Sequence, residues 1–266
     1  MEAAHYEQDG LWGTESIFTP EHQFPKLDAV ARLVPGDART VVELGAGDGR
    51  VLHHLSTVRP DLTSIAVERS LAALGHVELP GVRASIDAIP LRSRSVDVAL
   101  CCEVLEHLPG PIFDGARREL ARIAGDWIVV TVPNRENRAR AEIRCEACGC
   151  RYNADRHLRS FAPDDLATLF DGFEVDEIIE TGPHQPVYPR WARLALERRG
   201  LLVRPGSPSC PQCGAVYPYA VANHQIGPGE HPSGSPSLGA RGYRLARRFL
   251  PKARHPYYLC ARFRRR

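Results

Sequence analysis

The chain has 266 residues, enough for one large domain or for a domain of about 200 residues with a smaller appendage. Apolar residues make up 43% and charged residues 25%, which excludes a fibrous or wholly disordered chain. The longest apolar runs are too short and too polar to cross a bilayer, and the acidic N-terminus lacks the features of an export signal. A cytoplasmic protein without a membrane span is therefore expected.

The formal net charge of +2 hides an uneven distribution of charge along the chain. Residues 241–266 hold ten Lys or Arg and no Asp or Glu, so the first 240 residues hold 24 basic and 32 acidic residues, a net charge of −8. An extended nucleic-acid interface needs many basic contacts to phosphate, so nucleic acid is not the expected partner of this acidic body. The basic tail is open to two interpretations, a binder of phosphate groups or anionic surfaces, and a solvated chain end.

Strand-like and helix-like segments alternate through most of the chain. The run "TVVELGAG" at residues 40–47 reads as a buried strand that ends in glycines, and a helix-like segment follows it. Further strands are expected at residues 64–68, 81–88, 95–108 and 126–134, and the clearest helix between them at residues 113–124. This alternation predicts a parallel, doubly wound α/β sheet with helices on both faces.

The later elements are less regular. A helix start is predicted in residues 161–170, and strands are predicted at residues 173–182 and 255–264. Between these two strands, residues 190–203 are helix-like, whereas residues 226–242 are rich in Gly, Pro and Ser, which predicts a mobile loop.

The segment "ELGAGDG" at residues 43–49 joins an acidic residue to three glycines at the turn from strand to helix. Glycines let the chain turn sharply and bring its amides against a ligand at the start of a helix. Glu43 precedes the glycines, where its carboxylate could bind an amino group. Glu68 ends the next strand, a position from which a carboxylate binds ribose hydroxyls. Asp87 follows the third strand, where it could accept a hydrogen bond from an adenine amine.

Together with "VDVALCCEVLEHL" at residues 96–108, these motifs resemble those of the class I S-adenosylmethionine-dependent methyltransferases over roughly residues 40–182. The resemblance implies a Rossmann-like, seven-stranded methyltransferase sheet with helices on both faces, and S-adenosylmethionine as the cofactor. The cofactor-binding residues that it implies are Glu43, Gly45, Gly47, Gly49, Glu68, Asp87, Ala88, Ile89, Cys102 and Glu103. The GxGxG spacing also differs from the GxGxxG of dinucleotide enzymes, which disfavours an oxidoreductase.

Methyl transfer from a sulfonium needs mainly orientation, with a base where the acceptor is a hydroxyl. His107 is the best candidate for that base, with Glu106 beside it in the same motif. This motif is also common in the resembled family as scaffolding and cofactor contact, so both roles stay open. The N-terminal segment is expected either to form a lid, as in members of that family, or to pack on the sheet edge.

Eight cysteines include two CxxCG units, at residues 145–149 and 210–214. Without an export signal, metal is a better interpretation of these units than disulfides. Two CxxC turns supply four thiolates, the ligand set of a tetrahedral structural zinc site. The expected zinc ligands are Cys145, Cys148, Cys210 and Cys213, with Cys150 or His157 as substitutes for one of them. The zinc site would join two insertions that are distant in the sequence and shape one wall of the substrate-binding site.

These features divide the chain into three predicted parts. They are residues 1–39 as an N-terminal lid or cap segment, residues 40–143, 158–189 and 243–266 as the methyltransferase core, and residues 144–157 and 190–242 as zinc-stapled insertions.

The expected function is the S-adenosylmethionine-dependent O-methylation of a small polar acceptor, such as a sugar or a secondary metabolite, by direct in-line transfer. One alternative is a metal-dependent RNA 2′-O-methyltransferase, because residues 103–107 and His157 are similar in order to the metal ligands of the plant small-RNA 2′-O-methyltransferase family. Another is a non-catalytic binding module that kept the cofactor fold. The sequence specifies neither the acceptor nor the oligomeric state.

Overall fold

The structure is a computed structural model of the 266-residue chain, which folds into two compact units. It describes residues 6–7, 12, 20–136, 138, 142–145, 147–153, 155–187, 191, 210–215 and 253–266. The sheet unit comprises residues 2–135, 158–183 and 256–266, and the cysteine unit comprises residues 136–157 and 184–255 together with residue 1. The predicted loop at residues 226–242 lies outside the described residues, as does the predicted helix at residues 190–203 apart from Trp191.

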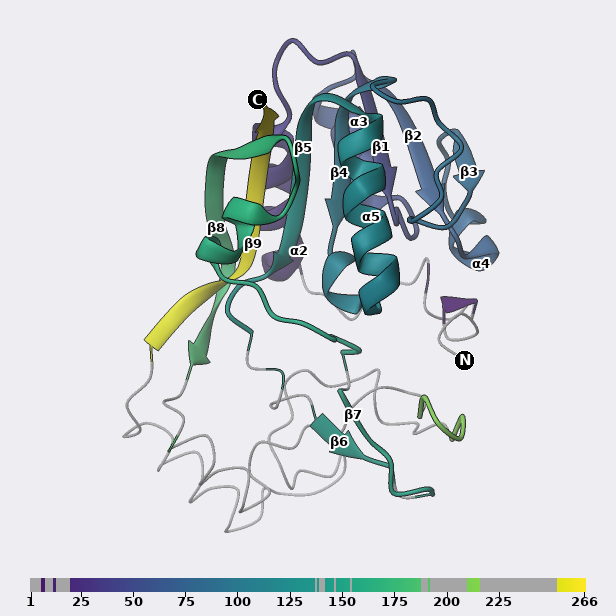
Figure 1. Ribbon diagram of the computed structural model, residues 1–266, viewed down its shortest axis with the longest axis vertical. Helices are drawn as coiled ribbons and strands as arrows, with labels where there is room; N and C mark the ends of the chain where they lie inside the picture. The colour runs from purple at the N-terminus through teal and green to yellow at the C-terminus, as the bar shows by residue number, and fades with distance from the viewer. Residues whose placement is uncertain are drawn as a thin grey trace. The chain divides into compact units, whose positions relative to one another are not determined.

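The sheet unit is built on a seven-stranded sheet with the strand order β3-β2-β1-β4-β5-β9-β8 (Figure 1). The strands are β1 (Thr40–Leu44), β2 (Thr63–Glu68), β3 (Gly81–Arg83), β4 (Val96–Cys102), β5 (Ala124–Pro133), β8 (Phe173–Val187) and β9 (Ala253–Arg265). Strands β1 to β5 pair in parallel, as expected, whereas β9 pairs antiparallel with β5. An antiparallel neighbour needs no crossover helix, so the last strand breaks the parallel pattern without breaking the sheet. The predicted Rossmann-like fold class is confirmed.

Two strands are shorter than predicted. The strand expected at residues 81–88 ends at Arg83, and the one expected at residues 95–108 ends at Cys102. After Cys102 the chain turns at Glu103, whose φ of 56° lies in the left-handed region, and then forms the 3-10 helix η2 (Leu105–His107). The end of β4 is therefore a sharp turn that hydrophobic periodicity does not reveal.

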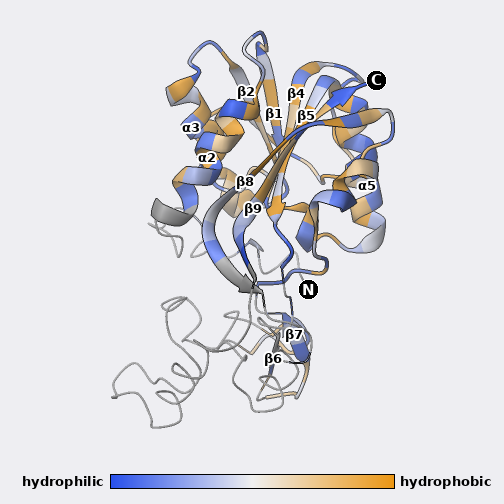
Figure 2. Cartoon of the chain, turned by 90° about the vertical axis from the view of Figure 1, so that its left-hand side faces the viewer, coloured by the Kyte–Doolittle hydropathy of each residue, from blue (hydrophilic) through white to orange (hydrophobic). Residues whose placement is uncertain are grey.

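Helices cover both faces of the sheet (Figure 2). Helices α2 (Pro20–Leu33) and α3 (Arg50–Val58) lie on one face and α5 (Gly110–Ile123) lies on the other. Helix α2 packs into the core through Leu27, Val30 and Leu33, which are at most 7% exposed. Residues 20–33 of the predicted N-terminal segment are thus part of the packed sheet unit.

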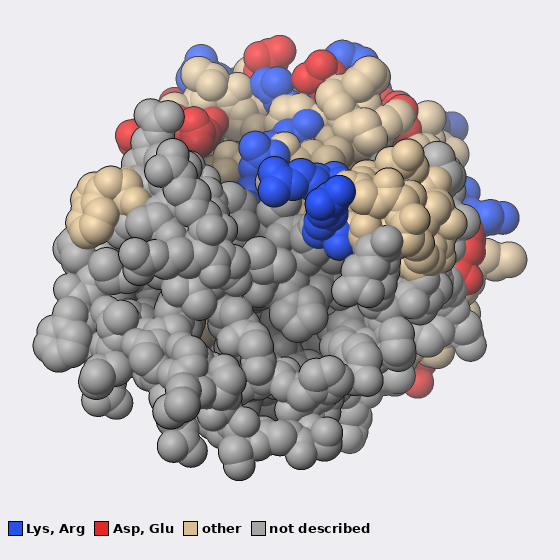
Figure 3. Space-filling model, turned by 90° about the horizontal axis from the view of Figure 1, so that it is seen from below, with Lys and Arg blue, Asp and Glu red and all other residues tan. Residues whose placement is uncertain are grey.

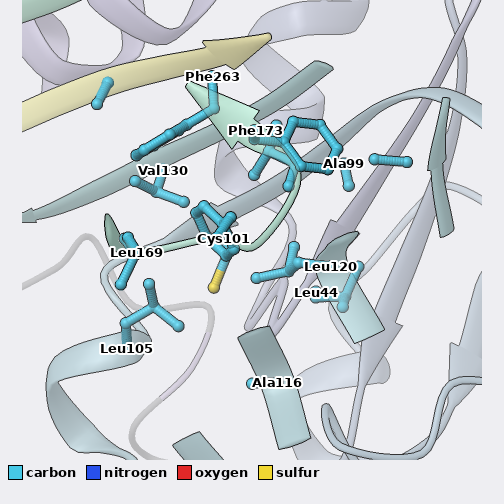
Figure 4. Close-up of a cluster of buried hydrophobic side chains, with 14 of the residues drawn as sticks. Leu44, Ala99, Cys101, Leu105, Ala116, Leu120, Val130, Leu169, Phe173 and Phe263 are labelled. Atoms are coloured by element: carbon cyan, nitrogen blue, oxygen red, sulfur yellow. The ribbon is translucent and has the colours of Figure 1, made fainter. Parts of the chain in front are cut away.

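The core between the sheet and α5 joins side chains from strands far apart in the sequence. Leu44, Cys101, Val130 and Phe263 come from β1, β4, β5 and β9, and each is at most 1% exposed. Figure 4 shows them with some of the other residues of this cluster. A fully buried side chain of this size stabilises the fold by about 1.5–3 kcal/mol, so the core holds the strand ends in a fixed arrangement.

The remaining described elements are short. They are α4 (Leu71–Leu74), the 3-10 helix η4 (Pro163–Thr168), and the strands β6 (Glu142–Arg144) and β7 (Arg151–Asn153). In the cysteine unit, β6 pairs antiparallel with β7. The helix start predicted in residues 161–170 thus begins a 3-10 helix. No helix in the described part of the chain is long and apolar enough to cross a membrane.

Candidate functional site

The glycine-rich loop joins β1 to α3 and bends over the end of β2. Its three glycines have φ angles in the left-handed region: Gly45 at 74°, Gly47 at 56° and Gly49 at 79°. The Gly45 amide donates a hydrogen bond to the Val67 carbonyl oxygen at 2.8 Å. A Cβ on Gly45 would also lie 2.6 Å from Cγ2 of Val104, too close for a side chain. Because these glycines have no side chains, the backbone at these three positions stays open, as a ligand-binding turn requires.

Glu68 holds this loop from the end of β2. Its carboxylate accepts a hydrogen bond from the Gly47 amide at 3.0 Å, and from the amides of Arg69 and Ser70 at 2.7 and 2.8 Å. Hydrogen bonds to a charged acceptor are worth more than neutral ones, so Glu68 fixes the position of the loop. Its predicted contact with ribose stays a prediction.

Glu43 lies at the end of β1 and is 2% exposed. Its Oε2 atom has no hydrogen-bond partner among the residues that the structure describes. Burial raises the pKa of Glu43 to about 8, while Lys26 and Cys102 act in the opposite direction. A buried carboxylate oxygen without a partner costs free energy, and an ammonium group of a bound ligand would relieve that cost. This orphaned oxygen fits the amino group of S-adenosylmethionine.

The predicted adenine-binding residues form the loop after β3. Asp87 is half-buried and accepts a short hydrogen bond from the Ser85 hydroxyl. Ala88 is exposed, and its amide closes a turn onto the Ser85 carbonyl oxygen at 3.0 Å. Ile89 is 5% exposed and packs into the core next to α5. The loop thus presents one carboxylate and one small side chain beside an apolar anchor.

Cys102 and Glu103 lie where β4 ends. Burial raises the pKa of the Cys102 thiol well above its usual value. Glu103 accepts a hydrogen bond from the Thr131 hydroxyl at 2.8 Å, and its amide donates to the Thr131 carbonyl oxygen at 2.9 Å. These two bonds hold Glu103 in its strained backbone conformation, a type of strain that clusters at functional sites.

Glu106 and His107 follow in η2. Glu106 is fully buried, His107 is half-buried, and Nε2 of His107 lies 3.9 Å from Oε1 of Glu106. Two hydrogen bonds from the loop before η4 hold the turn: the Leu158 amide donates to the Glu106 carbonyl oxygen at 2.7 Å, and the side-chain Nη1 of Arg159 donates to the Leu105 carbonyl oxygen at 2.7 Å. The ring of Tyr6 meets the imidazole of His107 edge-on at 6.5 Å. The catalytic role of His107 and Glu106 stays a prediction.

The described residues of the N-terminal segment also contact this region. The Glu7 carboxylate accepts a hydrogen bond from the Leu71 amide at 2.9 Å and pairs with Nη2 of Arg83 at 3.2 Å. A Cβ on Gly47 would lie 3.0 Å from the Trp12 ring, so that ring lies against the glycine loop. Among the described residues, Glu7 and Trp12 thus lie beside the cofactor motifs, and the lid interpretation stays a prediction.

The cysteine unit brings the two CxxCG turns together. The four predicted ligands, Cys145, Cys148, Cys210 and Cys213, have Sγ atoms within 4.8 Å of one another. The Cys145–Cys213 and Cys148–Cys210 sulfur pairs are 3.6 and 3.7 Å apart. These distances exceed the disulfide length of about 2.05 Å. They match the edge of about 3.8 Å of a tetrahedron with metal–sulfur bonds of about 2.3 Å.

The two turns share one backbone geometry. The Gly149 amide donates to the Cys145 carbonyl oxygen at 2.8 Å, and the Gly214 amide donates to that of Cys210 at 2.9 Å. The first cysteine of each turn also donates its own amide to the carbonyl oxygen five residues later, at 2.8 Å in both cases. Two equivalent turns that face each other fit one metal ion held by four thiolates. Cys150 lies outside this group, and its thiol faces the Arg151 carbonyl oxygen at 3.5 Å.

His157 belongs to the cysteine unit, where Nδ1 lies 2.6 Å from Oε2 of Glu136. Both side chains are at most 8% exposed. Because Glu106 and His107 belong to the other unit, the hypothesis of a divalent metal shared with His157 stays a prediction.

Sequence reasoning missed three charged residues near the cofactor motifs: Lys26 on α2, and Glu119 and Arg122 on α5. Lys26 acts on the pKa of Glu43, and the other two bind the loop of Asp87 from the side of α5. The only sequence signal for these residues is the helical spacing of Glu119 and Arg122, and that spacing does not predict which part of the protein they contact.

The comparisons with known proteins agree with this geometry. The chain matches the methyltransferase domain family over residues 21–178. It therefore belongs to that family, and it is an S-adenosylmethionine-dependent methyltransferase, which goes against the hypothesis of a non-catalytic binding module.

Individual relatives differ in their acceptors. The ubiquinone biosynthesis O-methyltransferase of Paracidovorax citrulli (strain AAC00-1) is 24% identical over 204 residues, which cover 68% of this chain and 83% of that protein. The tRNA (guanine-N(7)-)-methyltransferase of Halorhodospira halophila (strain DSM 244 / SL1) is 32% identical over 104 residues, 39% of this chain and 42% of that protein. The crystal structure of Burkholderia thailandensis 1,6-didemethyltoxoflavin-N1-methyltransferase, with bound S-adenosylhomocysteine, shares the fold with a TM-score of 0.51 and 15% identity, over 99% of this chain and 85% of that one.

Proposed function

We propose that this methyltransferase O-methylates a small polar acceptor, such as a sugar or a secondary metabolite, by direct in-line transfer. The observation that carries the proposal is the half-buried imidazole of His107, held by η2 directly after β4 and beside the acidic Glu106. An imidazole accepts a proton near neutral pH, and a hydroxyl acceptor requires such a base because an alcohol is a poor nucleophile until its proton is removed. The similarity to the Paracidovorax relative, an O-methyltransferase, supports this choice of acceptor atom.

The cofactor residues have separate roles in this proposal. Glu43 binds the α-ammonium group, Glu68 binds the ribose hydroxyls, and Asp87 accepts a hydrogen bond from the adenine amine while Ala88 and Ile89 lie beside the base. Gly45, Gly47 and Gly49 form the cradle of the methionine end, with Cys102 and Glu103 at the end of β4 near the reacting centre. When bound, S-adenosylmethionine supplies an electrophilic methyl group.

The protein's own contribution is then orientation, proton removal and exclusion of water. His107 accepts the proton of the acceptor hydroxyl, a contribution of about 10²–10⁴-fold for a well-placed base. Glu106 stabilises the imidazolium that forms. Tyr6 and Trp12 belong to a lid that Glu7 fastens to the start of α4 and to Arg83, and this lid keeps water from the site.

We further infer that Cys145, Cys148, Cys210 and Cys213 hold a structural zinc ion. The tetrahedral spacing of the sulfurs and the two equivalent turns support this assignment. A site closed by four thiolates leaves no open position, so the zinc fixes the fold of the cysteine unit and takes no part in methyl transfer.

A second candidate is methylation of RNA, which the similarity to the Halorhodospira tRNA methyltransferase favours. The charge distribution opposes it, because the first 240 residues carry a net charge of −8. In Figure 3, the described residues on the face shown carry acidic as well as basic side chains, so this part of the surface is not uniformly basic. RNA binding depends on basic contacts to phosphate, so a small acceptor is the better candidate.

The test is the destination of the methyl group. Purified protein is incubated with S-adenosylmethionine carrying an isotope-labelled methyl group, once with a low-molecular-weight metabolite extract and once with total RNA. Label on an oxygen of a small molecule, lost in His107→Ala while S-adenosylhomocysteine still binds, supports the proposal. Label that enters RNA only, and only with magnesium or manganese, refutes it in favour of the second candidate.

A further inference from the structure

We propose that Glu119 and Arg122 on α5 are positioning residues that set recognition of the cofactor's adenine base, because they fix the loop that carries Asp87. The inference rests on the proposed role of this loop in cofactor binding. It gives α5 a role in positioning the adenine-binding loop, a role that neither the glycine loop nor the strand ends fill.

Glu119 and Arg122 form a two-pronged ion pair. Nε of Arg122 lies 2.7 Å from Oε1 of Glu119, and Nη2 lies 2.7 Å from Oε2. The pairing lowers the pKa of Glu119 below its usual value. Arg122 and Glu119 are 33% and 16% exposed, so the pair is partly shielded from water. Such parallel hydrogen bonds fix the direction of both side chains as well as their distance.

Both members of the pair also hydrogen-bond to the backbone of the loop after Asp87. Oε2 of Glu119 accepts a hydrogen bond from the Ile89 amide at 2.7 Å. Arg122 donates to the carbonyl oxygens of Ile89 at 3.0 Å and Leu91 at 2.7 Å. Three backbone groups directly after Asp87 and Ala88 are therefore held by two side chains of one helix.

A third residue of α5 sets the distance between the helix and the loop. A Cβ on Gly115 would lie 2.5 Å from Cβ of Asp87, so the helix approaches Asp87 as closely as a glycine allows. Gly115, Glu119 and Arg122 have the spacing i, i+4 and i+7, which places them on one face of the helix. That face leaves Asp87 little freedom to move.

This arrangement determines which group of the protein is left to recognise adenine. The Ile89 amide donates to Glu119 and the Ala88 amide donates to Ser85, so both donors already have an acceptor in the protein. The carboxylate of Asp87, with one oxygen held by Ser85, is the group left to accept the exocyclic amine of adenine. A fixed carboxylate favours an amine donor over a carbonyl oxygen at the same place on the base, because like partial charges repel.

The experiment compares two ligands that differ at this one atom. S-adenosylhomocysteine and S-inosylhomocysteine, in which a carbonyl oxygen replaces the adenine amine, are titrated calorimetrically into the wild type, Glu119→Ala, Glu119→Gln and Arg122→Met. Glu177→Ala is the matched control, because it removes a carboxylate paired with Arg32 and Arg262 on the far edge of the sheet. Thermal unfolding of each variant is recorded in parallel.

The wild type is expected to prefer the adenine ligand by about tenfold or more, the value of one hydrogen bond to a charged acceptor. Glu119→Ala and Arg122→Met lower this preference to about threefold or less, and Glu119→Gln keeps part of it because its amide oxygen still accepts from Ile89. Glu177→Ala keeps the full preference whatever its stability. A preference that survives in Glu119→Ala and Arg122→Met, or that the wild type lacks while binding both ligands, overturns the inference. A wild type that binds neither ligand refutes the proposed cofactor site itself.

Discussion

Replacement of Glu43 by glutamine tests the link between a buried charge and cofactor binding. The carboxyl group is 2% exposed, and burial raises its pKa to about 8. At pH 7, one unit below that pKa, about one tenth of the free protein has Glu43 ionised. If only the ionised form binds the ligand's ammonium group, the apparent Kd equals the intrinsic Kd divided by this fraction. The affinity of the wild type for S-adenosylhomocysteine then rises about tenfold from pH 6 to pH 7.

Glu43→Gln removes this titration. The variant loses a charged hydrogen bond worth roughly 1.5–3 kcal/mol, so it binds S-adenosylhomocysteine more weakly than the wild type at pH 8. Any titration of the ligand itself affects both proteins equally. The difference between their pH profiles therefore reports Glu43 alone.

The raised pKa of Glu43 also predicts that the stability of the ligand-free protein falls as the pH rises, whereas its affinity for the ligand increases. Because the pKa is raised on folding, the folded state binds more protons than the unfolded state between pH 4.5 and about 8. The contribution of Glu43 to stability is fully present below pH 4.5 and is lost as the pH rises through about 8, by about 1.4 kcal/mol per pH unit inside this window. Glu43→Gln lacks this loss, so at pH 8 it is expected to unfold at a higher temperature than the ligand-free wild type.

Calorimetric titration at pH 6, 7 and 8 and thermal unfolding at the same pH values check both effects. Titration in two buffers of different ionisation enthalpy adds the number of protons released, close to one for the wild type at pH 7 and none from this site in Glu43→Gln. Parallel pH profiles of the two proteins, in binding and in stability, would refute the reasoning.

Three further changes test other parts of the site. Glu68→Ala should weaken binding of S-adenosylhomocysteine by roughly 1.5–3 kcal/mol in a calorimetric titration, because the charged acceptor of ribose and of the Gly47 amide is lost; an unchanged Kd would contradict the assignment. Cys210→Ser should lower both the zinc content measured by elemental analysis and the melting temperature, whereas Cys150→Ser should change neither. Full zinc and unchanged stability in Cys210→Ser would show that other residues build the site. Glu7→Ala should speed proteolytic cleavage of the N-terminal segment, and an unchanged cleavage rate would show that Glu7 does not fasten it.

Local patterns were sufficient for most of the sheet. β-Branched apolar runs such as residues 40–44 and 126–133 favour buried strands, and their alternation with helices predicts the parallel part of the sheet. The antiparallel direction of β9 and the turn at Glu103 escaped prediction. Both depend on how the chain returns to the sheet, which periodicity does not encode.

The residues of the candidate site likewise fall into those that the sequence predicts and those that it does not. Glu43, Glu68 and Asp87 can be proposed from the sequence because the carboxyl ends of parallel strands meet at one edge of the sheet, so sequence position predicts proximity; their roles in binding the cofactor stay predictions. Glu119 and Arg122 were missed because the faces of α5 are assigned by tertiary packing, 30 or more residues from the loop that they hold. The pairing of the two CxxCG turns was predictable despite their separation, because each turn supplies only half of a tetrahedral ligand set.

The measurement that tests the account most directly is native mass spectrometry of the purified chain, with and without added S-adenosylhomocysteine and after chelation. The account predicts one cofactor molecule and one zinc ion per chain, with the zinc lost on chelation or reduced in Cys210→Ser and the fraction of cofactor-bound protein reduced in Glu68→Ala. A chain that binds no cofactor under conditions where it is folded would contradict the central claim that the glycine loop, Glu43 and Glu68 form a methyl-donor site.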